Sequence, residues 1–388
     1  MPTKKRILML IESSTSYGRG MARGIARYAQ RRGDWEITVQ PRGMAEPIPA
    51  LRSERWDGVI SRLSDHRAAE SVRRLDCPTV ELLYDEQVPV FGDDDAIASL
   101  ALDHFARLGF ERVGFFSFGG CFWIRHRRES FLRECRRRGL SAEVFDPLPS
   151  SRDRRPEPLW REGNEEALDK WIGRLPRPTA ILAANDHQAI WLLNACRRRG
   201  AAVPDSIAIC GVNNDEHLCE IVSPTLTSID QNAERIGREA ARLLEMKIDG
   251  RPVVGYPRKI PPLGRVERQS TDAFPNDDSQ MVRAYRLIRD QAVFGLRVAD
   301  VMAECSVTER SLQRWFKKRF GHTPEKEIAL IRLRKAKELL RTTNLSIRAV
   351  AEQSGFSSER YFSQAFRRLT GMSPNQYRQR RGDTRQAR

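Results

Sequence analysis

Two segments near the end of this 388-residue chain repeat each other, and this repeat constrains the fold more than any other feature. Residues Val298–Thr308 match Ile347–Ser357 at an offset of 49, and the pattern L/F-x-x-x-F at Leu312 recurs at Phe362, at an offset of 50. Each copy has the apolar periodicity of a short helix, a tight turn and a second short helix. A duplicated unit of this kind predicts two helix-turn-helix motifs.

The second helix of each copy is predicted to have one apolar and one polar side. Its capping residue is Thr308 in the first copy and Ser357 or Ser358 in the second. The apolar sides consist of Leu312, Trp315 and Phe316, and of Tyr361, Phe362, Phe366 and Leu369. The polar sides consist of Arg310, Gln313, Arg314 and Lys317, and of Glu359, Arg360, Ser363, Gln364 and Arg367. Arginine suits guanine, glutamine suits adenine, and further cations meet phosphates, so the polar sides predict binding in the major groove.

The positive charge of the chain is concentrated in the same segment. Residues 281–388 hold 24 Lys+Arg and 10 Asp+Glu, a net charge of +14, out of +16 for the whole chain. An Arg-rich composition without a function would spread the charge evenly. A small helical bundle with a solvated charged face stays open as the alternative. Duplication, spacing and charge together favour double-stranded DNA as the partner.

Residues 290–380 resemble the DNA-binding domain of the AraC/XylS family of transcription regulators. The resemblance rests on Arg332-Leu-x-x-Ala-x-x-Leu-Leu340, Ile347-x-x-Val-Ala-x-x-x-Gly-Phe-Ser357, Tyr361-Phe-Ser-x-x-Phe-Arg-Arg368 and Gly371-x-Ser-Pro-x-x-Tyr-Arg378. The first copy departs from the pattern at Cys305-Ser306 and at Trp315. The resemblance implies that a rigid helix joins the two units and that both recognition helices enter successive major grooves. The residues that it places against bases are Arg310, Gln313, Arg314, Arg360, Ser363 and Gln364.

From Arg6 to about Ile260, short apolar segments alternate with amphipathic ones. Strands are predicted over Ile7–Ile11, Trp35–Val39, Gly58–Ile60, Thr79–Leu83, Arg112–Phe116, Ala180–Ala184 and Ile207–Val212. Helices are predicted over Gly20–Arg31, Leu100–Leu108, Arg127–Arg138 and His187–Arg198. This alternation predicts parallel sheets covered by helices, and the number of units favours two doubly wound lobes. Ligands of such folds bind beyond the carboxyl ends of the strands.

Polar residues gather at these predicted strand ends. The candidates for binding a small effector are Ser14, Tyr17, Asp93, Trp123, Arg127, Asn185, Asn213 and Asp215. Planar polar groups suit the adjacent hydroxyls of a sugar, and an aromatic ring suits its C–H face. Simpler interpretations stay open: Asp93 and Asn185 as helix N-caps, Arg127 as a solvated charge, and Trp123 as a core residue.

Together with His104–Phe116 and Ser223–Ile229, these positions resemble the periplasmic-binding-protein-like effector domain of LacI/GalR-type regulators. The resemblance implies a bilobal, dimeric sensor for a sugar, xylose or a related monosaccharide. Arg127 matches the effector-binding arginine, and Asn185 matches the asparagine before a helix. Asn213 matches the aspartate of the usual G-x-D-D, so the acid is shifted by two residues to Asp215.

An enzyme is the main alternative. Gly18-Arg-Gly-Met-Ala-Arg-Gly24 opens a helix after a strand, as in dinucleotide sites, but its spacing is G-x-G-x-x-x-G and no acidic residue ends the next strand. A tight turn and close helix packing explain these glycines better. His104, His126, His187 and His217 have no metal-ligand spacing, so no catalytic residue, metal or cofactor is predicted. A DNA-tethered sugar- or nucleotide-processing enzyme, and a constitutive DNA-binding protein with a vestigial sensor, stay as alternatives.

The sequence therefore predicts a sugar-responsive transcription regulator. We expect an α/β bilobal sensor at 1–270, a polar linker at 271–280, an all-α domain with two helix-turn-helix units at 281–382 and a disordered tail at 383–388. Seven cysteines without a C-x-x-C pair, and an initial apolar run of five residues, predict a cytoplasmic protein. The family resemblance implies a homodimer that activates transcription, with RNA polymerase as a further partner.

Overall fold

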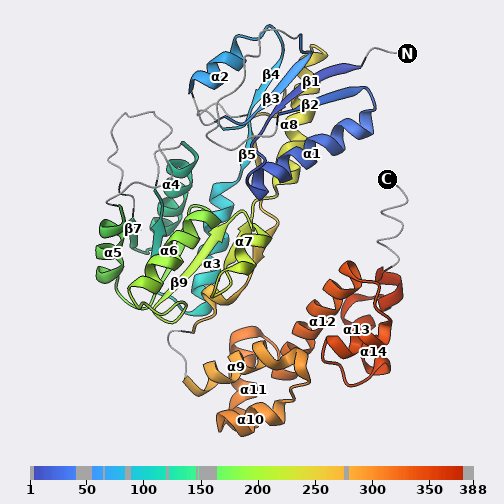
Figure 1. Cartoon of the computed structure of the whole chain (residues 1–388). Helices are drawn as coiled ribbons and strands as arrows, with labels where there is room; N and C mark the ends of the chain where they lie inside the picture. Colours follow the sequence, from blue (N-terminus) through green and yellow to red (C-terminus); the bar gives the residue numbers. More distant parts are fainter. Residues whose placement is uncertain are drawn as a thin grey trace. The chain divides into compact units, whose positions relative to one another are not determined.

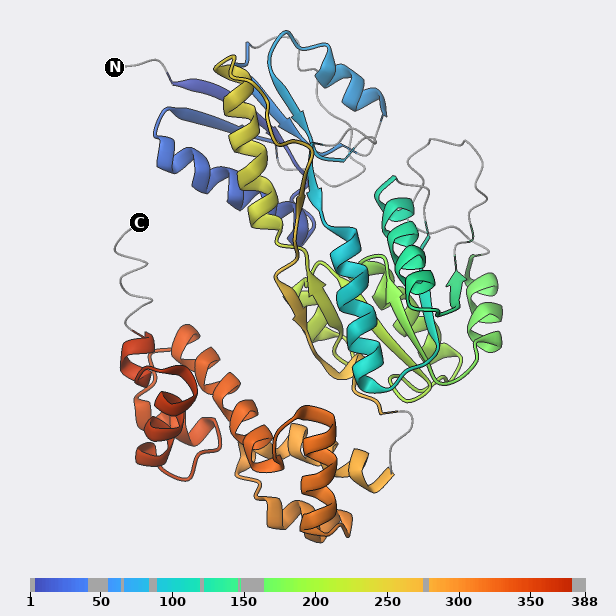
Figure 2. The same cartoon turned by 180° about the vertical axis from the view of Figure 1, so that it is seen from behind.

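A computed structural model (Figure 1, Figure 2) describes residues 4–40, 55–63, 66–83, 89–118, 122–145, 147, 164–274 and 279–378. The chain divides into two compact units, Met1–Pro275 and Asn276–Arg388. The tail expected at 383–388 lies outside the described residues. Within them, six cysteines are free thiols, and no helix is long and apolar enough to cross a bilayer.

The first lobe of unit 1 is built on a parallel sheet with the strand order β2-β1-β3-β4 (Figure 1). Its strands are β1 (Lys5–Leu10), β2 (Trp35–Val39), β3 (Gly58–Ser61) and β4 (Thr79–Glu81). Its helices are α1 (Ser16–Arg32), α2 (His66–Arg73) and α8 (Ala233–Ile248). Ile7 and Met9 pack with α1 and α8, whereas Leu8 and Leu10 pack with α2. Both faces of β1 are therefore buried, which explains its continuous apolar run.

The second lobe contains a six-stranded sheet with the order β12-β10-β9-β8-β6-β7. The strands are β6 (Val113–Phe116), β7 (Ala142–Phe145), β8 (Thr179–Ala183), β9 (Ile207–Val212), β10 (Thr227–Asp230) and β12 (Gly264–Val266), which is the antiparallel one. The helices are α3 (Asp94–Leu108), α4 (Phe122–Arg137), α5 (Asn164–Arg174), α6 (Asp186–Arg198) and α7 (Glu216–Ile221). The two doubly wound lobes predicted from the alternation are confirmed, including all seven predicted strands.

Three segments cross between the lobes. β5 (Val90–Gly92) leads into α3, residues 230–232 lead back to α8, and β11 (Arg258–Ile260) leads to β12 (Figure 2). The crossings are bonded to one another: the Asp93 amide donates to the Ile260 carbonyl at 2.9 Å, and the Leu263 amide to the Asp230 carbonyl at 2.9 Å. These bonds make the crossings one hinge, which places Gln231 between the lobes.

The glycines near the start of α1 serve helix packing. A Cβ on Gly24 would lie 2.0 Å from the carbonyl oxygen of Glu234 on α8, and one on Gly237 would lie 2.0 Å from the carbonyl oxygen of Met21. Backbone contacts this close require glycine on both helices. The packing interpretation of the glycine pattern is therefore confirmed.

The predicted linker begins too early. Residues 271–274 are buried, and η1 (Gln269–Thr271) is hydrogen-bonded to the second lobe. The Ser270 hydroxyl donates to the Ile209 carbonyl at 2.6 Å, and the Thr271 hydroxyl lies 2.8 Å from His104 Nε2. The segment is polar because its hydroxyls satisfy buried groups, not because it is solvated. Residues 275–278 lie outside the described part of the chain.

Unit 2 consists of helices over the described residues 279–378, as predicted. They are α9 (Ser279–Gln291), η2 (Ala292–Phe294), α10 (Val298–Cys305), α11 (Glu309–Phe320), α12 (Pro324–Thr342), α13 (Ile347–Gln353) and α14 (Glu359–Thr370). The pairs α10/α11 and α13/α14 are the two helix-turn-helix copies, and α12 joins them as one continuous helix. Thr323 caps α12 and Pro324 occupies its first turn, where the missing N–H costs nothing.

A buried carboxyl group lies at the carboxyl end of the second sheet. Asp186 accepts a hydrogen bond from the Ser228 hydroxyl at 2.5 Å and another from the Asp215 amide at 2.8 Å. Burial, its largest perturbation, raises the pKa of Asp186 to about 7. The folded protein therefore holds a proton on Asp186 at pH values where the unfolded chain has lost it.

Replacing Gly237 by Ala should destabilise unit 1, because the new methyl group would meet a backbone carbonyl that cannot move freely. We expect a loss of about 1–3 kcal/mol, measured as a lower midpoint of thermal unfolding of the full chain. Gly173→Ala is the matched control, since its Cβ would meet only an Arg199 nitrogen, at 3.7 Å. An unchanged midpoint for G237A would contradict the close packing of α1 on α8.

Replacing Asp186 by Asn should flatten the pH dependence of stability. The contribution of Asp186 to the wild-type free energy of unfolding falls as pH rises from about 4 to about 7, because only the folded state keeps this proton. The slope should lose up to about 1.4 kcal/mol per pH unit in the variant. Urea unfolding at several pH values measures it, with the exposed Asp76→Asn as control. Equal slopes in wild type and D186N would refute the raised pKa.

Candidate effector site and DNA interface

A pocket of about 350 Å³ lies where the first lobe faces α4. Leu82 and Leu83 line it from the first lobe and Phe91 from the hinge strand β5. The second lobe contributes Asp94, Phe122, Trp123, His126 and Glu129. Of the predicted effector residues, Trp123 lines this pocket and is half-buried, so it is not a core residue. Asp94 and His126 are lining residues that the sequence analysis missed.

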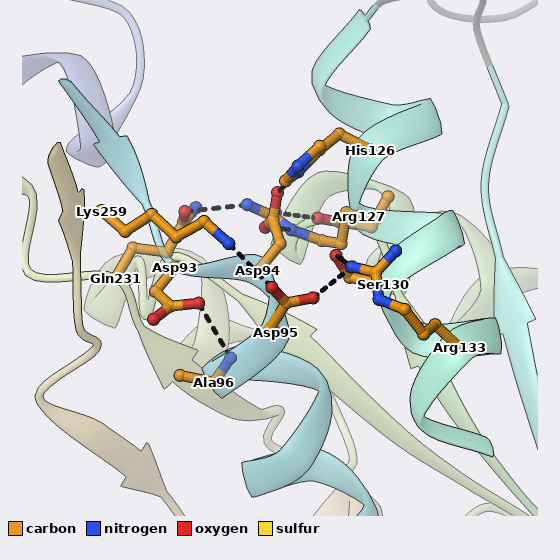
Figure 3. Close-up of polar contacts among 11 residues, drawn as sticks. Asp93, Asp94, Asp95, Ala96, His126, Arg127, Ser130, Arg133, Gln231 and Lys259 are labelled. Carbon is orange, nitrogen blue, oxygen red and sulfur yellow. Dashed lines mark hydrogen bonds and ion pairs between the residues drawn. The ribbon is translucent and has the colours of Figure 1, made fainter. Parts of the chain in front are cut away.

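Arg127 lies directly behind this pocket and is 4% exposed, so the interpretation as a solvated charge is wrong. Its Nε donates to Asp94 at 2.7 Å, its Nη1 to the Ala184 carbonyl at 2.6 Å and its Nη2 to Gln231 at 2.8 Å (Figure 3). The guanidinium also lies over the Trp123 ring, 5.4 Å from the ring centroid. Arg127 therefore fixes two residues of the pocket wall.

Asp94 lies between two hydrogen-bonding partners, the Arg127 guanidinium and the His126 ring. One carboxylate oxygen accepts from Arg127, and the other lies 2.8 Å from His126 Nδ1 (Figure 3). Burial raises the pKa of Asp94, but the charge of Arg127 and the hydrogen bonds from His126 and Arg127 outweigh it, so the pKa stays below its ordinary value. Asp94 is therefore a buried carboxylate whose charge is compensated by Arg127.

The first lobe contributes a second cluster. Glu12, 1% exposed, is paired with Arg62, whose guanidinium lies 5.1 Å from the centroid of the Tyr17 ring. Burial raises the pKa of Tyr17 above its ordinary value, against the charges of Arg62 and Arg127. Glu12 and Arg62 were missed in the sequence, whereas Ser14 is solvent-exposed and belongs to neither cluster.

Three predicted effector residues are helix N-caps. Asp93 accepts from the Ala96 amide at 3.1 Å, Asn185 from the Gln188 amide at 2.9 Å, and Asp215 from the Leu218 amide at 3.5 Å. The capping interpretation of Asp93 and Asn185 is thus confirmed. Asp215 does more than cap α7, because its second carboxylate oxygen accepts from the Ser16 amide of the first lobe at 3.3 Å. Asp215 therefore ties the two lobes together.

Asn213 connects to the pocket through the hinge. Gln231, 4% exposed, donates its amide nitrogen to the Asn213 side chain and accepts from Arg127 with its amide oxygen. A Cβ on Gly92 would lie 2.7 Å from that oxygen, so a larger residue here would have to displace the Gln231 side chain. The sequence gives little reason to predict a role for Gln231, because it is a single polar residue between a strand and a helix.

The two predicted DNA-reading faces lie on α11 and α14 and are open to solvent. Arg310, Arg314 and Lys317 are exposed on α11, as are Glu359, Arg360, Gln364 and Arg367 on α14. Gln313 and Ser363 are half-buried, and Gln313 donates to Glu309 at 3.0 Å. Among the described residues, none of the five basic side chains in these faces has an ion-pair partner. Their charges are therefore available to phosphates or bases.

The caps and the buried sides of these helices agree with the sequence in all but one place. Thr308 caps α11 through the Ser311 amide, and Ser358, not Ser357, caps α14 through the Tyr361 amide. Tyr361 is 49% exposed, so its assignment to the apolar side was wrong. Tyr361 is the third residue of α14, and a side chain at this position lies on the polar side of the helix.

The two copies are joined by specific contacts across α12. Arg332 donates to the carbonyls of Ala292 and Leu296, just before the first copy, at 2.7 and 2.8 Å, and its guanidinium lies 6.0 Å from the Phe356 ring centroid in the second copy. Gly355, with φ +80°, packs so closely on η2 that a Cβ would lie 2.6 Å from the Val293 carbonyl oxygen. These contacts join the segment before the first copy to α12 and to the turn of the second copy.

Comparisons with known proteins agree with both units. Residues 102–271 match the periplasmic binding protein-like domain, and residues 301–380 match a helix-turn-helix domain. No group of three or more metal-binding side chains occurs in the part of the chain that the structure describes.

Two curated relatives match almost the whole chain. The xylose operon regulatory protein of Escherichia coli (strain K12) is 27% identical over 97% of this chain and 98% of its own length. The protein of the same name from Haemophilus influenzae is 26% identical over 96% and 98%.

A solved structure, the xylose-binding transcription activator xylR, matches with a TM-score of 0.65 and 25% identity over 97% of this chain and 98% of its own. The relatives are regulators, not enzymes. The chain is therefore similar over almost its whole length to xylose operon regulatory proteins, and it joins a periplasmic binding protein-like domain to a helix-turn-helix domain.

Proposed function

We propose that this protein is a cytoplasmic transcription regulator that binds a neutral monosaccharide, xylose or a related sugar, between the lobes of unit 1. The observation that carries this proposal is the pocket whose wall is fixed by the Asp94–Arg127 pair. Because Arg127 compensates Asp94, the pair creates no net charge that would call for an ionic ligand. A neutral ligand with several hydroxyls fits such a wall.

The shape and lining of the pocket support a sugar. Its volume of about 350 Å³ lies at the lower end of the range for small-molecule sites, about 300–1,000 Å³. Phe91, Phe122 and Trp123 supply aromatic surface for the C–H groups of a sugar ring. Asp94, His126 and Glu129 supply polar atoms for its hydroxyls. The names of the relatives suggest xylose as the first sugar to test.

The proposed DNA-binding surface consists of the exposed faces of α11 and α14. In this proposal Arg310, Gln313 and Arg314 read one major groove, and Arg360, Ser363 and Gln364 read the next. Lys317 and Arg367 approach phosphates, and Glu359 lies at the start of the second face. The contacts of Arg332 and Gly355 support a DNA-binding unit in which the two recognition helices keep a constant spacing.

Effector binding and DNA binding are proposed to be coupled through lobe closure. The Asp215–Ser16 bond across the lobes and the Gln231 bonds in the hinge are the contacts that a change in lobe angle would alter. We propose that closure changes the pairing of two sensors in a homodimer and so the presentation of the DNA-binding units. Activation through RNA polymerase is the proposed outcome, and the effector is bound without being turned over.

Isothermal titration calorimetry with D-xylose, L-arabinose and D-glucose tests the sugar site. At least one sugar should bind, and Trp123→Ala should weaken its binding about tenfold, because the pocket loses an aromatic face worth about 1 kcal/mol or more. Trp191→Ala, on the surface of α6, is the matched control and should bind like wild type. Absence of binding by every sugar to folded protein would reject the sugar proposal.

Replacing Arg310 or Arg360 by Ala tests the reading faces. Each change should weaken binding to DNA, selected by the wild-type protein from a random library, by about 1–3 kcal/mol. Arg334→Ala, exposed on α12, is the control, and sugar binding should be unchanged in all three variants. Footprints that persist in R310A and R360A would show that the faces are assigned wrongly. DNA affinity insensitive to every sugar would favour a vestigial sensor.

A further inference from the structure

We propose that His126, in its charged form, is the side chain that donates a hydrogen bond to an oxygen of the effector, and that Asp94 orients it for this task. This inference rests on the proposed sugar site. It assigns a role to a histidine whose spacing in the sequence fits no metal site.

The position of His126 gives its ring one bonded and one open nitrogen. Nδ1 lies 2.8 Å from the Asp94 carboxylate, while Nε2 has no hydrogen bond to a described residue (Figure 3). The side chain is 30% exposed and lines the pocket. The open nitrogen is therefore available to a ligand rather than satisfied by the protein.

The surroundings of the ring hold it in one orientation. Phe91 meets it edge-on, with centroids 5.9 Å apart and an interplanar angle of 83°, and Phe122 lies 5.9 Å away at 34°. Neither phenylalanine competes for a hydrogen bond. Asp94 is itself fixed by Arg127, so the imidazole is oriented by a partner that cannot rotate away. A carboxylate that fixes the far nitrogen of a histidine is a common way to aim the near one.

The hydrogen-bonding capacity of the other lining residues explains why a donor is needed. Asp94 and Glu129, as carboxylates, only accept, and the four aliphatic or phenyl side chains do neither. The indole of Trp123 carries one N–H, whose capacity does not change with pH. A sugar presents ether and hydroxyl oxygens that accept, so it gains most from a second, cationic donor. Charged His126 is that donor.

The charges around His126 favour this form. The hydrogen bond to Asp94 raises the pKa of His126 above its ordinary value, against the effect of burial. Asp94 and Asp95 on α3 act in the same direction, and Lys259 on β11 opposes them. On its own helix, Arg127 is neutralised by Asp94, and Glu129 faces the same pocket. These interactions therefore favour the charged form, which is lost as pH rises through the raised pKa of His126.

Calorimetry of the full chain with the tightest-binding of D-xylose, L-arabinose and D-glucose tests the inference. Above the His126 midpoint, wild-type binding should take up one proton, seen as a heat that depends on the ionisation enthalpy of the buffer. Affinity should then fall by up to about tenfold per pH unit. This measurement needs no variant, so a folding defect cannot obscure it.

Two substitutions separate contact with the sugar from a structural role. In His126→Asn, the amide nitrogen can replace Nδ1 toward Asp94, but nothing replaces Nε2. The variant should bind at least about tenfold more weakly at pH 6 and lose the proton uptake. His126→Gln extends an amide toward the ligand and should recover part of the affinity. His217→Asn, exposed on α7, should match wild type.

The outcomes distinguish the inference from the proposed function. Sugar binding without proton uptake and with wild-type affinity in H126N would overturn the role of His126 and leave the sugar site intact. A loss in H126Q but not in H126N would also overturn it, because only the bond to Asp94 would then matter. No binding of any sugar to the wild-type protein would overturn both proposals.

Discussion

The buried guanidinium of Arg127 is the interaction on which the structure of unit 1 depends. It is 4% exposed, and its hydrogen-bond acceptors come from the start of α3, the end of β8 and the hinge. A charge this deep is tolerated only when it is paired and hydrogen-bonded, so these three elements must meet at one point. The same requirement positions Asp94, and through Asp94 it positions His126. One cation thus links the core of the second lobe, the hinge and the pocket.

Three consecutive aspartates, Asp93, Asp94 and Asp95, have three different sets of partners. Asp93 caps α3, Asp94 pairs with Arg127 and His126, and Asp95 pairs with Arg133 and Lys259 (Figure 3). Successive side chains on a helix point about 100° apart, so neighbours in the sequence meet different partners. The partners of Asp94 and Asp95 lie 30 or more residues away in the chain, whereas Asp93 bonds an amide three residues on. From the sequence, Asp93 was predicted to be the effector-binding residue of this acidic run. Only tertiary contacts distinguish the roles of the three aspartates.

The DNA-binding unit was far more predictable, because its signal is local and occurs twice. Helical periodicity decides which side of α11 and α14 is buried, and Leu312, Phe316, Phe362 and Phe366 are all inside as expected. The error at Tyr361 came from judging an aromatic residue by its type rather than its position, which corresponds to that of Ser311 in the first copy. Ser306, with φ +53°, likewise takes the place of Gly355 in the turn. Both copies therefore form the same turn, although the first has serine where the second has glycine.

The sequence by itself determined two doubly wound lobes, the double helix-turn-helix unit and, with the exception of Tyr361, the buried side of each recognition helix. All of these follow from the periodicity of apolar residues within short segments, since burial of one helix face or of both sheet faces is a local constraint. Only the tertiary structure decided which polar residues form the pocket. Glu12, Arg62, Asp94, His126 and Gln231 acquire their roles from partners in other elements, and a buried polar group is defined by those partners rather than by its neighbours in the chain.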